Sequence, residues 1–77
     1  MKHLRSGAHR HLCAVLIAVR KEAGLTQRQL AERLKKPRSF VANIETGERA
    51  IKALEVADWA KATNLVPWKL YKRAIPS

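Results

Sequence analysis

Three side chains that can read DNA bases, Arg38, Ser39 and Asn43, recur along one short stretch. Arginine can bond guanine through two hydrogen bonds, asparagine can do the same with adenine, and serine bonds several base edges in the major groove. At about 100° per residue they share one helix face, while Val41 and Ile44 point the opposite way. This face is predicted to bind nucleic acid. The alternative is an ordinary solvent-exposed helix face. The sequence on either side of this helix decides between the two interpretations.

Signals for two consecutive helices surround this face. Thr26 and Gln29 have the spacing of a capping box, in which each side chain bonds a backbone N–H at the other's position. Pro37 disfavours the α region at the residue before it and suits the first turn of a new helix. Gly47 can adopt the left-handed conformation of a helix C-cap. The sequence therefore predicts a helix that starts after Thr26, a break at 35–37, and a second helix over 38–46, which together form a helix-turn-helix.

Three further helices are predicted, over about 9–23, about 53–63 and from Pro67 onward. Gly24 and Asn64 are suited to end the first two, because both residue types tolerate the left-handed conformation of a helix cap. Leu25 and Leu65 then return to the core. The predicted buried faces are Leu12, Leu16, Val19 and Ala23 in the first helix, and Ala53, Val56, Ala57 and Ala60, with Trp59 beside them, in the second.

Charge and length restrict the classes of function. The 77 residues carry 16 Lys and Arg against six Asp and Glu, a formal net charge of +10, which attracts polyanions. A chain of this length builds one small domain with no room for a separate effector module. The apolar run 14–19 is far shorter than the roughly 20 residues that span a bilayer, so no membrane partner is predicted. A single cysteine, Cys13, excludes an intramolecular disulfide, fits the reducing cytoplasm and is predicted to serve packing.

Between about Leu12 and Leu70 the sequence resembles the phage-repressor helix-turn-helix family of the Cro or XRE type. The resemblance implies an all-α, compact five-helix domain of the lambda-repressor kind, in a bacterial or phage-encoded cytoplasmic regulator. One departure is Lys35, which stands in the turn where the family usually has glycine. The matching segments are Arg-Lys-Glu-Ala-Gly-Leu-Thr-Gln at 20–27, Leu30-Ala31 and Leu34, Ser-Phe-Val at 39–41, Ile44-Glu45, and Gly-Glu-Arg at 47–49.

The resemblance also implies roles for individual residues. It places the start of the first helix of the motif against a phosphate, where helix N–H groups favour an anion, and puts the loop after the second helix along the DNA backbone. It implies an ion pair between Arg20 and Glu45, since a planar guanidinium suits a partly buried carboxylate. The expected base contacts are Arg38, Ser39, Asn43 and Phe40, the last only if its ring is not simply core. The expected phosphate contacts are Gln27, Arg28, Thr46, Arg49 and Lys52.

The C-terminal segment contains more large apolar residues than a small core obviously needs. Trp68, Leu70, Tyr71 and Ile75 either complete the core or meet a second subunit. One recognition helix contacts only a few base pairs, and two-fold dimers overcome this by placing two such helices on an inverted repeat. The leading hypothesis is therefore a double-stranded DNA-binding repressor that acts as a homodimer through these four residues.

Two other classes of function are weaker. An antitoxin or controller protein would couple DNA binding to a toxin or another protein partner, but the long apolar extension that would distinguish it is missing from the short ends. An enzyme has little support, because the chain has no paired carboxylates in a plausible cleft, no Gly-rich phosphate loop and no nucleophile with a base. No cofactor is expected.

The N-terminal region divides at about residue 9. Residues 1–8 are predicted to be a flexible basic segment, either a frayed end or an arm laid along DNA, ahead of a DNA-binding domain over 9–75. His9, His11 and Cys13 lack the fourth convergent ligand that zinc usually requires. No metal site is predicted.

Overall fold

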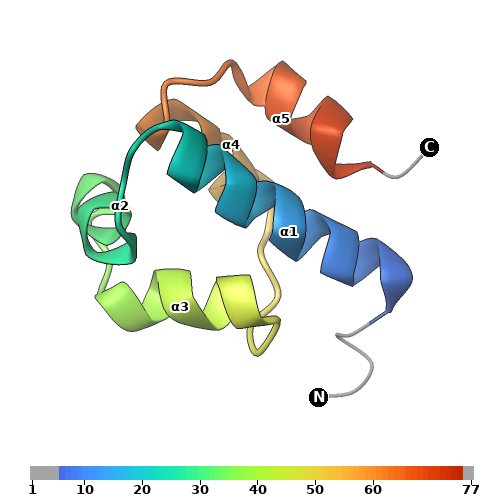
Figure 1. The fold of residues 1–77 in the computed structure, drawn as a ribbon, viewed down its shortest axis with the longest axis horizontal. Coiled ribbons are helices and arrows are strands. Elements are labelled where there is room, and N and C mark those ends of the chain that lie inside the picture. The colour runs from blue at the N-terminus through green and yellow to red at the C-terminus, as the bar shows by residue number, and fades with distance from the viewer. Residues whose placement is uncertain (1–5, 76–77) are drawn as a thin grey trace.

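Five α-helices and no strand make up residues 6–75, the part of the chain that the structure, a computed structural model, describes (Figure 1). The contacts that build the globule join α2 to α3, α4 to α5, α1 to both α3 and α5, and α2 to α4. The prediction of an all-α, five-helix domain is confirmed. The helices are α1 (Gly7–Glu22), α2 (Gln27–Leu34), α3 (Arg38–Thr46), α4 (Ala53–Ala62) and α5 (Pro67–Ala74).

Helix α1 begins two residues before the predicted start at His9. Ser6 has an extended conformation, and its hydroxyl oxygen accepts the His9 backbone N–H at 3.2 Å, which is an N-cap bond. Gly7 and Ala8 therefore belong to the helical domain instead of to the predicted lead-in. The rest of that segment, residues 1–5, lies outside the described residues. At the other end of α1, Gly24 has a φ of +74° and ends the helix as predicted.

The turn between α2 and α3 is built on a left-handed lysine. Lys35 has φ 58° and ψ 44°, and the N–H groups of Lys35 and Lys36 bond the carbonyls of Glu32 and Ala31. Family members that place glycine here meet no Cβ penalty, whereas this chain pays a cost on the order of 1 kcal/mol. Pro37 lies just before α3 with φ −64°, and α3 spans the predicted range.

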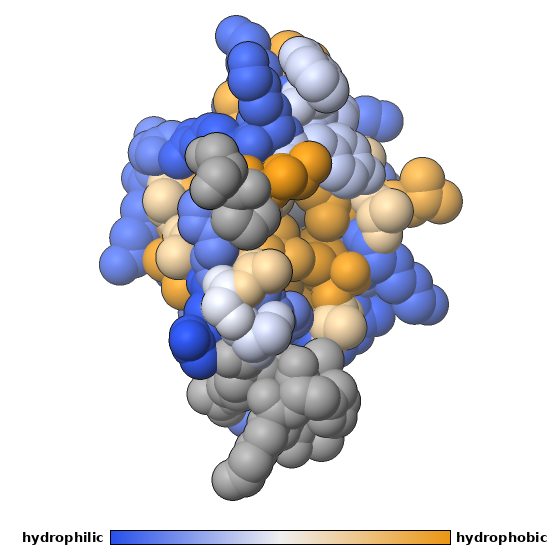
Figure 2. Space-filling view, turned by 90° about the vertical axis from the view of Figure 1, so that its right-hand side faces the viewer, coloured by the Kyte–Doolittle hydropathy of each residue, from blue (hydrophilic) through white to orange (hydrophobic). Residues whose placement is uncertain are grey.

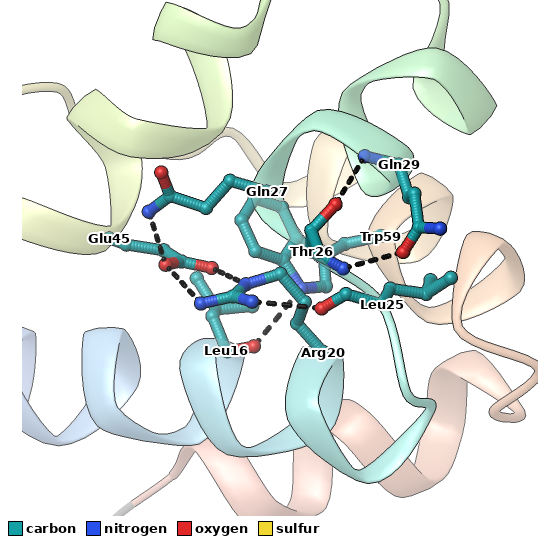
Figure 3. Close-up of polar contacts among 8 residues, drawn as sticks. All are labelled: Leu16, Arg20, Leu25, Thr26, Gln27, Gln29, Glu45 and Trp59. Atoms are coloured by element: carbon teal, nitrogen blue, oxygen red, sulfur yellow. Dashed lines mark hydrogen bonds and ion pairs between the residues drawn. The ribbon is translucent and has the colours of Figure 1, made fainter.

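The core forms around Trp59 of α4. Its side chain is fully buried, and the indole N–H donates to the Leu16 carbonyl at 3.3 Å, which joins α4 to α1 (Figure 3). Cys13 is buried, as predicted for a packing role, and its thiol donates to the Ile44 carbonyl at 3.3 Å. The other fully buried large side chains come from all the remaining helices: Leu16, Leu30, Val41, Ile44 and Leu70.

The buried face of α4 differs from the predicted one. Val56, Trp59 and Ala60 are buried, as is Thr63 just beyond the helix, whereas Ala53 is exposed. The helical periodicity predicted Trp59 beside the buried face because the four alanine and valine residues share one side of the helix and outnumber the single tryptophan. The indole ring has by far the largest surface to remove from water, so the helix turns that residue inward.

Candidate DNA-binding surface

The outer face of α3 projects the predicted base-contacting groups into solvent. Arg38, Ser39 and Asn43 are exposed, while Val41 and Ile44 on the other face are at most 1% exposed. Among the described residues, these three polar side chains make no hydrogen bond and no ion pair. Thr46 is exposed on the same helix, and its hydroxyl donates to the Asn43 carbonyl at 3.2 Å. The helix therefore presents free donors of the kind that bond base edges.

The start of α2 lies beside the start of α3. A shallow hollow of about 620 Å³ brings together residues from both helix ends and from α1. The backbone N–H groups at the start of α2 precede the first bond of the helix ladder, so this end favours an anion. The residues that line the hollow are Arg20, Thr26, Gln27, Arg28, Gln29 and Arg38. Predicted phosphate contacts from α2 and a predicted base contact from α3 thus share one surface.

A buried polar network fixes the two helices of the motif against α1 (Figure 3). Arg20 donates from Nε to Glu45 Oε2 at 2.6 Å and from Nη2 to Glu45 Oε1 at 3.1 Å, and its Nη1 bonds the Leu25 carbonyl at 2.9 Å. The Arg20 and Glu45 side chains are 11% and 3% exposed. The pair expected from the resemblance therefore lies in the interior, with each charge satisfied by several hydrogen bonds.

Gln27 belongs to the same network. Its side-chain amide donates to Glu45 Oε1 at 2.9 Å, and the residue is half-buried. Thr26 and Gln29 beside it form the predicted capping box, with reciprocal bonds of 2.9 Å and 3.0 Å. Gln27 thus uses its side chain within the protein, and its backbone N–H, at the first position of α2, has no partner within the helix and is the group suited to an anion.

Phe40 packs at the edge of the core and lies under two cations. Its ring is half-buried against the hydrophobic cluster, with the Lys36 Nζ 5.3 Å and the Arg49 Cζ 4.7 Å from the ring centroid. The sequence left open whether Phe40 touches a thymine methyl or belongs to the core. The structure places it at the core edge, beneath charged side chains that the sequence did not connect with it.

Arg49 lies where the loop after α3 was expected to follow the DNA backbone, but its guanidinium is bonded inside the chain. It donates to both oxygens of Glu55, at 2.8 Å and 3.0 Å, and to the Ala50 carbonyl at 2.9 Å. The hydrogen bonds from Arg49 are the main cause, and the bond from the Lys52 backbone N–H the second, of a Glu55 pKa lowered to about 2. Lys52 itself is exposed. Sequence reasoning missed Glu55, although its position three residues after Lys52 is that of the acid in a capping box.

The four C-terminal residues predicted to form a subunit contact do not share one environment. Leu70 is fully buried in the core of its own chain, so its assignment to an interface was wrong. Tyr71 is half-buried and donates its hydroxyl to the Ala53 carbonyl. Trp68 and Ile75 are 67% and 68% exposed. Leu70 is the only leucine, isoleucine or valine within α5, and its burial removes the largest aliphatic side chain of that helix from water.

Other kinds of site find no support in the described structure. No group of three or more His, Cys, Asp or Glu among residues 6–75 could hold a metal ion. None of the helices in the same range has the length and apolar character needed to cross a membrane. Half of the six acidic side chains, Glu22, Glu45 and Glu55, are each paired with an arginine among the described residues.

The fold and this surface define a helix-turn-helix domain whose second helix exposes Arg38, Ser39 and Asn43 to solvent. A family model described as Helix-turn-helix matches residues 16–69. The chain belongs to this family of Cro/C1-type, XRE-like DNA-binding transcription regulators.

Among solved structures the chain is similar to an XRE-family like protein from Pseudomonas syringae pv. tomato str. DC3000. The two chains share 32% identity with a TM-score of 0.84, over 95% of this chain and 89% of that one. No curated protein sequence matches this chain. The family identified from the residues at 20–49 is thus confirmed by a match that extends from α1 into α5.

Proposed function

We propose that this protein is a sequence-specific repressor that binds double-stranded DNA as a homodimer on an inverted-repeat operator. One observation carries the proposal: the exposed face of α3 holds Arg38, Ser39 and Asn43 with no partner inside the described chain. Donors left free on a rigid helix are preorganised for base edges, because no internal bond has to break when they bind. A DNA-binding domain of this kind represses transcription most simply by occupying its site.

The backbone contacts surround this face. The Gln27 and Arg28 N–H groups at the start of α2, the Arg28 side chain, Thr46 and Lys52 are the groups we assign to phosphates. These contacts position α3 in the groove and account for affinity without sequence preference.

The second copy is expected at the end of the domain where α1 begins and α5 ends. Figure 2 shows apolar side chains gathered on this side, and a hollow of about 410 Å³ lies there, lined almost wholly by apolar atoms. Among the described residues that line this hollow, two are titratable: His9, whose buried Nε2 has no partner in the same part of the chain, and Tyr71. On a chain of net charge +10, this is a surface where two copies meet with little repulsion. The lining is Ala8, His9, Leu12, Val56, Tyr71, Ala74 and Ile75.

The dimensions of the domain agree with a contact at this end. The longest dimension of the domain is 29 Å, and the apolar surface lies at one end of this axis, on the right in Figure 1. A two-fold contact there separates the domain centres by about one such length. Recognition helices on adjacent half-sites are about 34 Å apart, so the two lengths are compatible.

The test begins with selection of binding sites from random duplex DNA, followed by titration of the selected site and of random DNA over a range of salt. We expect an inverted repeat, and a log–log salt slope of about −0.9 for each phosphate contacted. Arg38→Ala and Asn43→Ala should each cost roughly 1–3 kcal/mol on the selected site and little on random DNA. No enrichment in the selection, or equal loss on all sequences, would contradict base reading by α3.

Sedimentation with and without the selected duplex tests the dimer. We expect two chains per inverted repeat, and weaker paired binding for Ile75→Asp, with Leu54→Asp as the matched control because Leu54 is 80% exposed and does not line the hollow. A one-to-one complex on an asymmetric site would exclude the homodimer. Stable binding to a toxin or other protein in place of a second copy would favour the antitoxin alternative.

A further inference from the structure

Arg49 follows α3 on the side of the molecule that faces DNA in the proposed function, but its guanidinium is bonded within the chain. Its Nη1 donates to Glu55 Oε1 and to the Ala50 carbonyl, and its Nη2 donates to Glu55 Oε2. These bonds use three of the five N–H groups of the guanidinium, whose flat face also lies over the Phe40 ring. A phosphate would have to compete with a bidentate carboxylate for this group.

The charge of Arg49 is also largely cancelled where it stands. The Arg49 and Glu55 side chains are 37% and 18% exposed, so their attraction is only partly screened by water. The pairing raises the pKa of Arg49 and lowers that of Glu55, and both groups stay ionised at neutral pH. The pair presents little net field to a phosphate backbone.

The bonds of Arg49 join the elements that hold the recognition helix. Its backbone N–H donates at 3.1 Å to the carbonyl of Asn43, a predicted base reader. Its side chain reaches Phe40 on α3 and Glu55 on α4, and Glu55 also accepts the Lys52 backbone N–H at 2.9 Å. Lys36, from the turn before α3, lies over the same Phe40 ring. Arg49 therefore connects the middle of α3 with the loop that follows it and the start of α4.

We propose that Arg49 is a positioning residue for DNA recognition, held in place by Glu55 and Phe40, and that it orients α3 and the Lys52 loop instead of binding a phosphate. The inference rests on the proposed DNA-binding function and deepens it. Loss of the Arg49 network should alter which sequence α3 selects, while the number of phosphates contacted stays the same.

Variants at three positions, residues 49, 52 and 55, separate positioning from phosphate binding. Arg49→Lys keeps the charge but loses the bidentate bond and the flat stacking surface. Glu55→Gln keeps the shape and the acceptor for the Lys52 N–H but loses the carboxylate that holds Arg49. Lys52→Ala is the matched control for a true phosphate contact, since Lys52 is exposed and forms no ion pair among the described residues.

The readouts are the ratio of affinities for the selected site and random DNA, and the salt slope on random DNA, measured on variants whose thermal unfolding shows that they are folded. We expect Arg49→Lys and Glu55→Gln each to lower the ratio at least roughly fivefold, the low end for loss of one base contact. Their salt slopes should match the wild type. Lys52→Ala should instead reduce the slope by about 0.9 and leave the ratio unchanged.

Two results would overturn the inference. The first is an Arg49→Lys variant that behaves as the wild type while Arg49→Ala loses about 0.9 of slope, which is the signature of a phosphate ligand. The second is a Glu55→Gln variant that binds all DNA more tightly, with an unchanged ratio of affinities for the selected site and random DNA. That result would mean that Glu55 only neutralises the charge of Arg49, which would otherwise bind a phosphate. If Glu55→Gln does not fold, Arg49→Lys decides alone. If the wild-type protein selects no sequence from random duplex DNA, the proposed function itself is refuted. This selection is carried out before any variant is made, so the two failures are distinguishable.

Discussion

Breaking the Arg20–Glu45 pair should destabilise the domain far more than breaking an exposed pair. Arg20→Met removes a guanidinium that makes three hydrogen bonds and leaves Glu45, 3% exposed, with its charge supported only by Gln27 among the described residues. Loss of one partner of a buried ion pair costs about 3–5 kcal/mol. A 77-residue domain has a total stability of roughly 4–12 kcal/mol. The variant should therefore lose roughly a quarter or more of the stability of the domain.

Urea and thermal unfolding followed by tryptophan fluorescence measure the effect, since Trp59 is fully buried and reports loss of the core. We expect a Tm lower by roughly 12 °C or more for Arg20→Met. The matched control is Arg73→Met, which breaks the bidentate Arg73–Glu22 pair on the surface, where the side chains are 39% and 59% exposed. Its Tm should stay near that of the wild type.

A double variant isolates the buried charge from the packing. Arg20→Met combined with Glu45→Met removes both charges, and replacement of a whole buried pair by apolar residues is often close to neutral. The double variant should therefore be more stable than Arg20→Met alone. The reasoning fails if Arg20→Met and Arg73→Met lower the free energy of unfolding by the same amount. It also fails if the loss in the double variant equals the sum of the losses in Arg20→Met and Glu45→Met measured singly.

Three further outcomes follow from local features. Lys35→Gly should stabilise the domain by about 0.5–1 kcal/mol in urea unfolding, because φ 58° strains any residue with a Cβ, and a loss of stability would contradict this origin of strain. The pKa of Glu55 is about 2 in the folded chain, below its unfolded value, so its contribution is present above about pH 4.5 and is lost as pH falls toward 2. The stability gap between wild type and Glu55→Gln should close over that window, and a gap independent of pH would refute the assignment. Trp59→Phe should cost roughly 1–3 kcal/mol in the same assay, since it shrinks the core and leaves the Leu16 carbonyl without its indole partner; a neutral result would show that the indole bond contributes nothing.

The arginines of the chain divide into those that are paired with carboxylates inside the fold and those that remain available to DNA. Among the described residues, three of the six acidic side chains are paired with arginines, and each pair joins two different elements: Arg20 of α1 with Glu45 of α3, Arg49 of the loop after α3 with Glu55 of α4, and Arg73 of α5 with Glu22 of α1. Arginine suits these places because its planar fork matches a carboxylate. Arg33 of α2 is also exposed but bonds the Ala62 carbonyl, whereas the side chains of Arg28 and Arg38 make no hydrogen bond among the described residues and are the ones that the proposed function uses.

Local signals in the sequence were sufficient to locate the helix-turn-helix. Thr26 and Gln29 form the predicted capping box, and Gly47 ends α3 with φ +84°. Each of these features depends on backbone conformation and on partners only a few residues away, so the residue types alone determine them. The polar face of α3 could be predicted for a similar reason, because helical periodicity fixes which residues share a side.

Only the tertiary structure decided which apolar residues are covered and which arginines are free. Leu70 and Ile75 are both aliphatic and lie on neighbouring turns of one short segment, yet one is fully buried and the other 68% exposed. Arg49 and Arg28 looked equivalent as phosphate ligands until the fold brought Glu55 to the first and left the second in solvent. Packing angles between helices set these outcomes, and such angles depend on all five helices together, which no local pattern of residues encodes.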